Sequence, residues 1–307
     1  MKVVLLSYDD YANLAFDQAE SLKSIGIDAE SFKLIPHPFA YDKQSQVITR
    51  EQMIREAEAA QTIVVMHSDL TISGMVKEMT KKNIAVYHTG SAYRGNPKVY
   101  NDEFNPYTFV TLTDQCEFMK LGAKNIEYNA AAIDVKSKLK FGHQVKRPYS
   151  FAHYPSNPEV KGTEEIKKMM LEAGINPEKA FFKCSSERVS HSEQLKRMDD
   201  CDIYIELFKP ELRGKPYGCY GVTAFEAAAA GKIVITNNIH EEVYENAYGE
   251  CALQIANTKE KFIQTVKNLS ELEDHMISAL QTETYRWILR NHSYEANGIK
   301  MKNLLEI

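Results

Sequence analysis

The stretch Tyr217-Gly-Cys-Tyr-Gly-Val-Thr-Ala-Phe-Glu-Ala-Ala-Ala-Ala-Gly-Lys-Ile-Val-Ile-Thr236 combines a glycine-rich loop, a helix of small residues and a buried strand. Gly218 and Gly221 have no side chains, so the loop backbone can approach a bulky ligand closely. A helix that begins near Gly221 directs its unpaired N–H groups back at the loop. The stretch therefore predicts an anion site at a helix N-terminus within an α/β fold.

Glu226 is the only long polar side chain on this predicted helix. It lies a little over one turn inside the helix, too far along to cap its N-terminus. Two interpretations remain open. The carboxylate accepts hydrogen bonds from two neighbouring sugar hydroxyls, or it faces water while the alanines around it pack tightly on a sheet.

Short apolar segments alternate with helical patterns on both sides of this stretch. The predicted strands are residues 3–6, 29–34, 62–66, 84–87, 109–113 and 126–129 in the first half, and 150–154, 180–183, 202–207, 232–236 and 252–255 in the second. The predicted helices lie near residues 12–25, 51–60, 115–121, 163–173 and 192–198, besides the helix of Glu226. Near-continuous apolar strands separated by helices are typical of parallel sheets covered on both faces. Two Rossmann-like doubly wound domains that face a cleft at the carboxyl ends of their strands are therefore expected.

A connection between the two predicted domains lies at residues 130–149, where small and basic residues surround Pro148. Its basic residues are Lys136, Lys138, Lys140, Lys146 and Arg147. They are read either as a contact for phosphates of DNA or of an anionic membrane, or as a solvated linker. Residues 274–305 are strongly helical and are expected to pack back across the first domain.

The composition is that of a soluble globular protein, with 307 residues, 44% hydrophobic and 26% charged. No apolar run approaches the length of a membrane-spanning helix, and Asp9 and Asp10 interrupt the N-terminal segment too early for a secretory signal. A cytoplasmic location is expected. The net charge of −5 argues against an overall basic coat for nucleic acid.

The cysteines predict neither a disulfide framework nor a zinc site. There are five, an odd number, widely spaced and without a Cys-x-x-Cys pair. Small core residues are the expected use of most of them.

Three segments, in this order and at this spacing, resemble the GT-B-fold glycosyltransferases, specifically the large retaining family that uses nucleotide-sugar donors (the glycosyl transferases group 1 type). They are His88-Thr-Gly-Ser-Ala-Tyr-Arg-Gly-Asn-Pro97, His153-Tyr-Pro-Ser-Asn-Pro-Glu-Val-Lys-Gly-Thr163 and the stretch around Glu226. The resemblance spans residues 84–260. It implies a Rossmann-like acceptor-side domain at residues 1–135, a Rossmann-like nucleotide-sugar domain at 149–275, and C-terminal helices at 276–307 that cross back to the first domain.

The resemblance also implies roles for particular residues. Lys161, followed by Gly162, matches the lysine that reaches the donor diphosphate, and an ammonium suits a leaving group that gains negative charge. Glu226 matches the glutamate that hydrogen-bonds the donor ribose, and His88 matches a residue that contacts the transferred sugar. These three are the expected catalytic residues. The further donor-binding residues expected from the same segments are Gly90, Ser91, Arg94, Gly162, Gly218, Tyr220, Gly221, Val222 and Thr223.

The chain departs from the family pattern at several positions. Many members carry a second glutamate where this chain has Gly218, and Glu206 or Glu211 is a candidate to supply that carboxylate. The family arginine upstream of the lysine is missing, and Arg188, Lys209 and Arg213 are candidates for the second cation. Asp9 and Asp10 replace glycines after the first strand, where helix N-capping is the favoured interpretation. His67, at the end of another strand, is a weaker acceptor-side candidate.

The expected function is transfer of a hexose-like sugar from a nucleoside-diphosphate sugar, expected to be a UDP-sugar, to an acceptor hydroxyl. Retention of anomeric configuration is implied by the resemblance alone. No metal or other cofactor is expected, since helix N–H groups and Lys161 can carry the phosphate charge. A nucleotide-sugar epimerase and a non-catalytic nucleotide or sugar binding protein remain open. The acceptor, whether a polysaccharide, a lipid-linked glycan or a modified DNA base, and the oligomeric state are not specified by the sequence.

Overall fold

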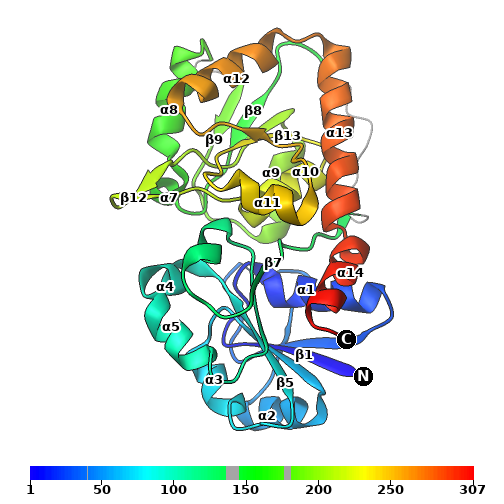
Figure 1. The fold of residues 1–307 in the computed structure, drawn as a ribbon. Coiled ribbons are helices and arrows are strands. Elements are labelled where there is room, and N and C mark those ends of the chain that lie inside the picture. The colour runs from blue at the N-terminus through cyan, green and yellow to red at the C-terminus, as the bar shows by residue number, and fades with distance from the viewer. Residues whose placement is uncertain (40, 136–144, 176–180) are drawn as a thin grey trace. The chain divides into compact units, whose positions relative to one another are not determined.

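The computed structural model describes residues 1–39, 41–135, 145–175 and 181–307. Two compact units divide the chain (Figure 1): Met1–Asp134 together with Asn291–Ile307, called unit 1, and Val135–Arg290, called unit 2. Of the basic residues in the predicted connection, Lys136, Lys138 and Lys140 lie outside the described residues.

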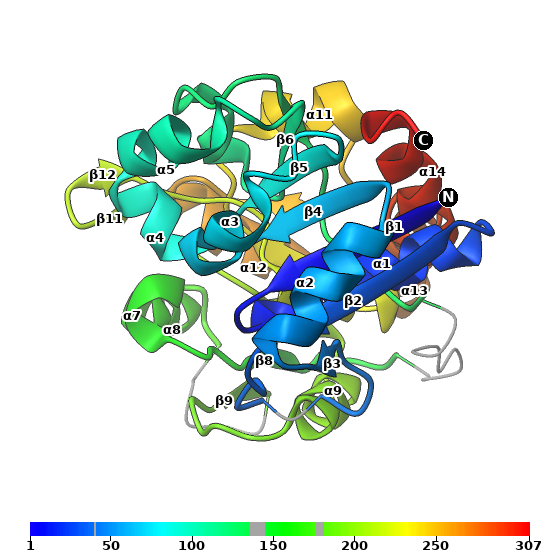
Figure 2. The same ribbon diagram turned by 90° about the horizontal axis from the view of Figure 1, so that it is seen from below.

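Unit 1 is built on a parallel sheet of seven strands. They are β1 (Lys2–Ser7), β2 (Asp28–Lys33), β3 (Gln46–Val47), β4 (Thr62–Met66), β5 (Asn83–His88), β6 (Val110–Thr113) and β7 (Ile126–Tyr128). Their spatial order is β3-β2-β1-β4-β5-β6-β7, and Figure 2 shows the central strands side by side. This is a Rossmann-type order, and the direction of winding reverses between β1 and β4.

Helices cover both faces of this sheet. They are η1 (Tyr11–Asn13), α1 (Leu14–Ser24), α2 (Arg50–Ala59), α3 (Leu70–Val76), α4 (Gly90–Gly95), α5 (Pro97–Phe104) and η2 (Cys116–Lys120), where η marks a 3-10 helix. Val4 and Leu6 of β1 share a buried cluster with Met53 of α2 and Ile72 of α3. Leu5, which alternation along the strand points to the opposite face, is equally buried. The sheet is therefore doubly wound, as its apolar strands predict.

The C-terminal helix α14 (Tyr294–Leu304) belongs to unit 1 and lies beside α1, although the two are far apart in sequence (Figure 1). Asn297 is fully buried, bonding the Ser21 hydroxyl at 3.2 Å and the Ala130 carbonyl at 2.9 Å. A side chain at Gly298 would overlap the carbonyl of Ser21, so a glycine is needed for this close approach. The helix thus closes the unit that the first residues of the chain begin.

Unit 2 carries a second parallel sheet, of five strands. They are β8 (Phe151–His153), β9 (Phe182–Cys184), β10 (Ile203–Ile205), β13 (Ile233–Thr236) and β14 (Gln254–Ile255), in the order β14-β13-β10-β8-β9. Its helices are α7 (Pro158–Lys161), α8 (Thr163–Glu172), α9 (His191–Asp199), α10 (Val222–Ala229), α11 (Glu241–Tyr248), α12 (Lys259–Glu271) and α13 (Asp274–His292), whose last two residues belong to unit 1. A short antiparallel hairpin, β11 (Glu211–Leu212) and β12 (Lys215–Pro216), precedes α10. The winding reverses between β8 and β10, which is the flavodoxin-like order.

The predicted strands are present, with ends within two residues of their expected positions in the described parts of the chain. One predicted helix differs. Residues 115–121 form the 3-10 helix η2 rather than an α-helix. The mixed α/β architecture with two parallel sheets confirms the fold class expected from the sequence.

Candidate functional site

Open parallel sheets bind ligands outside the carboxyl ends of their strands, at the point where the winding reverses. In unit 2 this point lies between β8 and β10. The loop after β8 leads through α7 to Lys161, and β10 is followed directly by Glu206. The expected diphosphate lysine therefore lies at the switch point of its own sheet.

Lys161 forms an ion pair with Glu206, whose side chain has no exposed surface. The other carboxylate oxygen of Glu206 accepts a hydrogen bond from the Thr236 hydroxyl at 2.9 Å, at the end of β13. The Thr223 hydroxyl of α10 lies 3.4 Å from the oxygen that also meets Lys161. The Lys161 ammonium is thus held against a buried carboxylate.

Gly221 is the N-cap of α10 and, as a glycine, has no side chain to cap this helix end. A Cβ at Gly221 would overlap the Glu206 carboxylate and come within 2.9 Å of the Lys161 ammonium. The ion pair therefore lies directly against the N-terminus of α10, where the helix dipole favours an anion. Val222 and Thr223, expected to face the donor phosphates, form the first turn of this helix.

Gly218 adopts φ +143°, a conformation that side chains rarely take, and a Cβ there would overlap the amide of Asn237. Asn237 is fully buried and joins two loops, since it donates to the Tyr217 carbonyl at 3.1 Å and accepts from the Lys209 amide at 2.8 Å. This chain has no room for a glutamate at Gly218. The carboxylate missing from the family pattern is excluded by a neighbouring amide side chain.

Glu226 is buried on α10, with 5% of its surface exposed. Its Oε1 lies 2.5 Å from Nε2 of His191, the first residue of α9. The alternative in which Glu226 faces water is therefore wrong. The contact fixes the carboxylate toward the N-terminal end of α9.

His191, Thr236 and Asn237 complete this site but were not among the expected residues. The sequence does signal where α9 starts, because Ser190 caps the amide of Glu193. It does not signal which distant side chain His191 meets, since 35 residues separate the two partners. Spacing along the chain cannot predict such a contact.

Gly162 joins α7 to α8 with φ +71°, and a side chain there would overlap the carbonyl of Phe208. Tyr220 is buried, with its ring packed edge to face against Phe225 and Tyr244. Its ring therefore belongs to the core around α10. The donor-binding roles expected for both residues stay predictions.

His88 ends β5 in unit 1 and is fully buried. Its ring stacks on Tyr93 of α4, with ring centroids 4.0 Å apart, and Nδ1 lies 2.8 Å from the Ser68 hydroxyl. Burial lowers the pKa of His88 to about 3, so the ring is neutral at pH 7. The buried ring differs from the expectation of a side chain that points at a ligand, because Tyr93 covers it; its catalytic role stays a prediction.

The loop after His88 continues into α4. Gly90 adopts φ +76° and Ser91 is exposed. Arg94 donates to Glu117 at 2.5 Å and lies over the Phe118 ring, 5.2 Å from its centroid. Arg94 thus pairs with a carboxylate of the chain itself, and its expected donor-binding role stays a prediction.

The switch point of unit 1 lies between β1 and β4, and a polar row crosses it. The row consists of Asp10, His67, Thr89 and Asp114, which follow the adjacent strands β1, β4, β5 and β6. His67 lies 3.5 Å from Asp10 and 2.8 Å from the Thr89 hydroxyl. His67 has φ +60° and Ser68 φ +56°, and such strain in consecutive residues is typical of functional loops.

The two carboxyl groups of this row have pKa values shifted in opposite directions. Burial opposes ionisation of Asp10, but hydrogen bonds from His67, Ser45 and the Ala15 amide hold its pKa below the usual value. Burial raises the pKa of Asp114 to about 6. Asp10 also accepts from the Phe16 amide at the start of α1, which agrees with its expected capping role.

The roles of the candidates for a second cation stay predictions. Lys209 pairs with Glu165 at 2.6 Å, Arg213 lies in the turn of the hairpin with φ +53°, and Arg188 is exposed. Lys161 lies at the N-terminus of α10.

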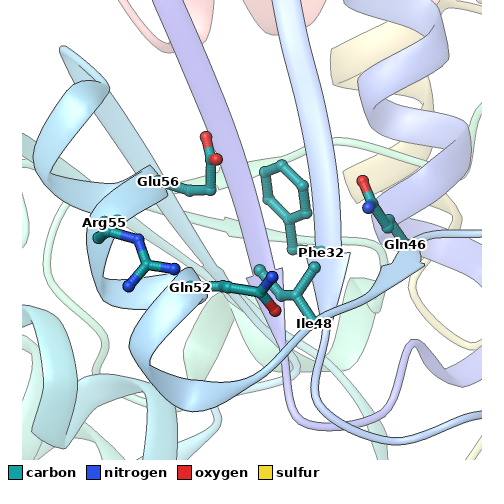
Figure 3. A pocket seen from close by; sticks show the side chains of 6 residues that line it. All are labelled: Phe32, Gln46, Ile48, Gln52, Arg55 and Glu56. Carbon is teal, nitrogen blue, oxygen red and sulfur yellow. The ribbon is translucent and has the colours of Figure 1, made fainter.

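Figure 3 shows a surface hollow lined by Phe32, Gln46, Ile48, Gln52, Arg55 and Glu56, which contains none of the expected site residues.

Within residues 1–39, 41–135, 145–175 and 181–307, no group of three or more His, Cys, Asp or Glu is placed to hold a metal ion. None of the helices described in these ranges combines the length and the apolar character needed to cross a membrane. None of the five cysteines, all of which lie in the described ranges, forms a disulfide bond.

Comparison with protein-family models found no match, and neither did comparison with curated protein sequences. Solved structures do match. HepE of Anabaena in complex with UDP and glucose superposes with a TM-score of 0.72 at 10% identity, over 100% of this chain and 99% of that one. Sucrose-phosphate synthase of Thermosynechococcus elongatus gives 0.64 at 11% identity, covering 100% and 98%. AviGT4, a glycosyltransferase of avilamycin A biosynthesis, gives 0.62 at 11% identity, covering 100% and 97%. The chain has the GT-B fold of these glycosyltransferases.

Proposed function

We propose that this protein is a glycosyltransferase that moves a hexose-like sugar from a UDP-sugar to an acceptor hydroxyl. The observation that carries the proposal is the corner of unit 2 where Lys161 meets the N-terminus of α10 at the switch point of the sheet. An ammonium and a helix N-terminus both attract a diphosphate. HepE, a structure with the same fold, was solved with UDP-glucose, which supports UDP-glucose as the first donor to test.

The transfer breaks the bond between the anomeric carbon and the diphosphate oxygen and forms a bond from that carbon to the acceptor oxygen. Negative charge develops on the departing diphosphate, where Lys161 and the first turn of α10 would stabilise it. The acceptor proton would pass to the departing phosphate oxygen, in the retaining reaction that the family resemblance implies. Glu226, oriented by His191, would accept hydrogen bonds from the ribose hydroxyls.

The acceptor would be held by unit 1. The row of Asp10, His67, Thr89 and Asp114 offers hydrogen-bonding groups at the carboxyl edge of that sheet. Such groups suit a hydroxyl-bearing acceptor, and they do not distinguish a polysaccharide from a lipid-linked glycan or a modified DNA base. No metal is needed in this scheme, so we expect a chelator to leave turnover unchanged.

Incubation with isotope-labelled UDP-glucose tests the proposal. We expect slow release of free labelled glucose and UDP, since water replaces the unknown acceptor. Conversion to another UDP-sugar would instead identify an epimerase, and binding without turnover a non-catalytic nucleotide-sugar binding protein.

A matched pair of variants tests whether the release of glucose depends on the proposed corner around Lys161. Lys161→Gln retains an N–H donor for the buried Glu206 but removes the positive charge. We expect it to lower glucose release at least about a hundredfold, as loss of a charge-stabilising donor does in other active sites. Lys168→Gln, on the neighbouring helix α8, should leave the release rate unchanged, and equal rates in all three proteins would contradict the proposal.

A further inference from the structure

The corner proposed for the diphosphate already contains an anion of the chain itself. Glu206 places its carboxylate against Gly221 at the N-terminus of α10, and its side chain is fully buried. It receives the Lys161 ammonium, the Thr236 hydroxyl and, at 3.4 Å, the Thr223 hydroxyl. These are the kinds of groups that hold a phosphate oxygen at a helix N-terminus.

We propose that Glu206 is an internal competitor of the donor diphosphate, which must give up Lys161 when the diphosphate binds. This inference rests on the proposed function, because it takes the α10 corner as the diphosphate site. Glu206 neutralises the Lys161 ammonium in this structure. The Lys161 side chain retains 19% exposure, so an incoming anion can reach the ammonium. Lys161 would then exchange a buried carboxylate for a phosphate oxygen.

The position of Glu206 in the fold supports this role. The strand β10, which ends just before Glu206, pairs with β8 on one side and β13 on the other, and Thr236 ends β13. The carboxylate is therefore fixed at the centre of the sheet edge and cannot swing into solvent as an exposed glutamate would. Lys161, at the end of the four-residue helix α7, is the partner that can move.

Removal of the Glu206 charge has two opposing effects on anion binding. Repulsion between a buried carboxylate and a phosphate charge about 6 Å away corresponds to roughly a hundredfold in affinity at an effective dielectric constant of about 20. Loss of the contact with Glu206 lets the Lys161 side chain regain part of its rotamer freedom. Because that freedom is lost again when the anion binds, anion binding weakens by about tenfold. The charge effect is the larger, so a neutral residue at 206 should tighten anion binding.

Calorimetric titration with pyrophosphate and with UDP tests the inference on wild type, Glu206→Gln and the control Glu271→Gln at one low salt concentration. Gln retains the shape of Glu206 and an acceptor for Thr236. We expect Glu206→Gln to bind pyrophosphate and UDP at least tenfold more tightly than wild type, and Glu271→Gln to match wild type. A purely structural role for Glu206 cannot produce a gain in affinity, and unchanged or weaker pyrophosphate binding by Glu206→Gln would overturn the inference.

A second measurement uses only the wild-type chain and so does not depend on the folding of a variant. In crystals soaked with pyrophosphate, the Lys161 ammonium should contact a phosphate oxygen and lie more than about 4 Å from Glu206, beyond salt-bridge distance. An ammonium still paired with Glu206 in the loaded crystal, or no pyrophosphate at the corner, would contradict the competition. Binding of pyrophosphate but not of UDP would count against the proposed nucleotide donor while leaving the role of Glu206 intact.

Discussion

At the scale of single residues, the glycines of the loop before α10 make room for the chain's own side chains. Gly221 accommodates the Glu206 carboxylate and the Lys161 ammonium, and Gly218 accommodates Asn237. The sequence correctly places a close backbone approach here, but it assigns that approach to a ligand. A glycine signals that something comes near, and only the folded chain identifies what it is.

Gly218→Ala is expected to lower the free energy of unfolding by about 2 to 4 kcal/mol. An alanine would be strained at this φ, and its Cβ would also overlap the buried Asn237. Gly214→Ala is the matched control. Gly214 also has a positive φ, +73°, but open space around its Cβ position, so only the backbone strain of about 1 kcal/mol applies. Urea unfolding of the two variants measures the difference. Equal losses in the free energy of unfolding would show that the Asn237 side chain moves aside at no measurable cost.

At the scale of secondary-structure elements, the hydrophobic pattern predicts the strands well because each one is a short apolar run buried on both faces. Elements that lack such a run were not predicted. The two-residue strand β3 and the hairpin of β11 and β12 are mostly exposed, and α4 consists of only Gly90–Gly95. The 3-10 geometry of η2 has no signal in its composition.

The packing of α14 on α1 gives a prediction at this scale. Gly298→Ala is expected to destabilise unit 1 by about 1 to 3 kcal/mol, because the added methyl group overlaps the Ser21 carbonyl and forces the helices apart. Gly74→Ala in α3 should have the opposite sign. Its Cβ position is open, so the variant gains up to about 1 kcal/mol of helix propensity. Thermal melts of both variants give the signs, and a stabilising Gly298→Ala would show that the two helices are not in close contact.

At the scale of the whole molecule, both units contain buried neutral histidines. Burial lowers the pKa of His88 to about 3 and of His292 to about 3 in unit 1, and of His153 to about 4 in unit 2. His153 bonds the Ile205 carbonyl at 2.8 Å and the Thr163 hydroxyl at 2.9 Å. Because the folded pKa values are depressed, the stability contributed by these neutral rings is complete above the unfolded pKa of about 6.5 and is lost as pH falls below it.

Each of these histidines is expected to reduce the free energy of unfolding by about 2 kcal/mol between pH 7.5 and pH 5. The measurement is the urea midpoint as a function of pH, together with NMR titration of the histidine ring protons. These three rings should not titrate between pH 5 and pH 8. Titration of all nine histidines near pH 6.5 would contradict the burial described here.

The sequence predicts the two α/β sheets and places Lys161, Gly221 and Glu226 in one unit, because local patterns and spacing carry that information. It does not predict the partners of these residues. Glu206 was one of two candidate carboxylates, and its distance from Lys161 along the chain is 45 residues. Contacts at such separations depend on how strands are ordered in the sheet, which the pattern of a single chain does not specify.

The central claim is that Glu226 and the α10 corner bind the nucleoside diphosphate of a sugar donor. Calorimetric titration of UDP into wild type and Glu226→Gln tests it most directly, because Gln retains an oxygen acceptor for His191 while removing the carboxylate charge. We predict that wild type binds UDP and that Glu226→Gln binds it at least about tenfold more weakly, as loss of a charged hydrogen bond to the ribose requires. Equal affinity of the two proteins for UDP, or no binding by wild type, would contradict the account.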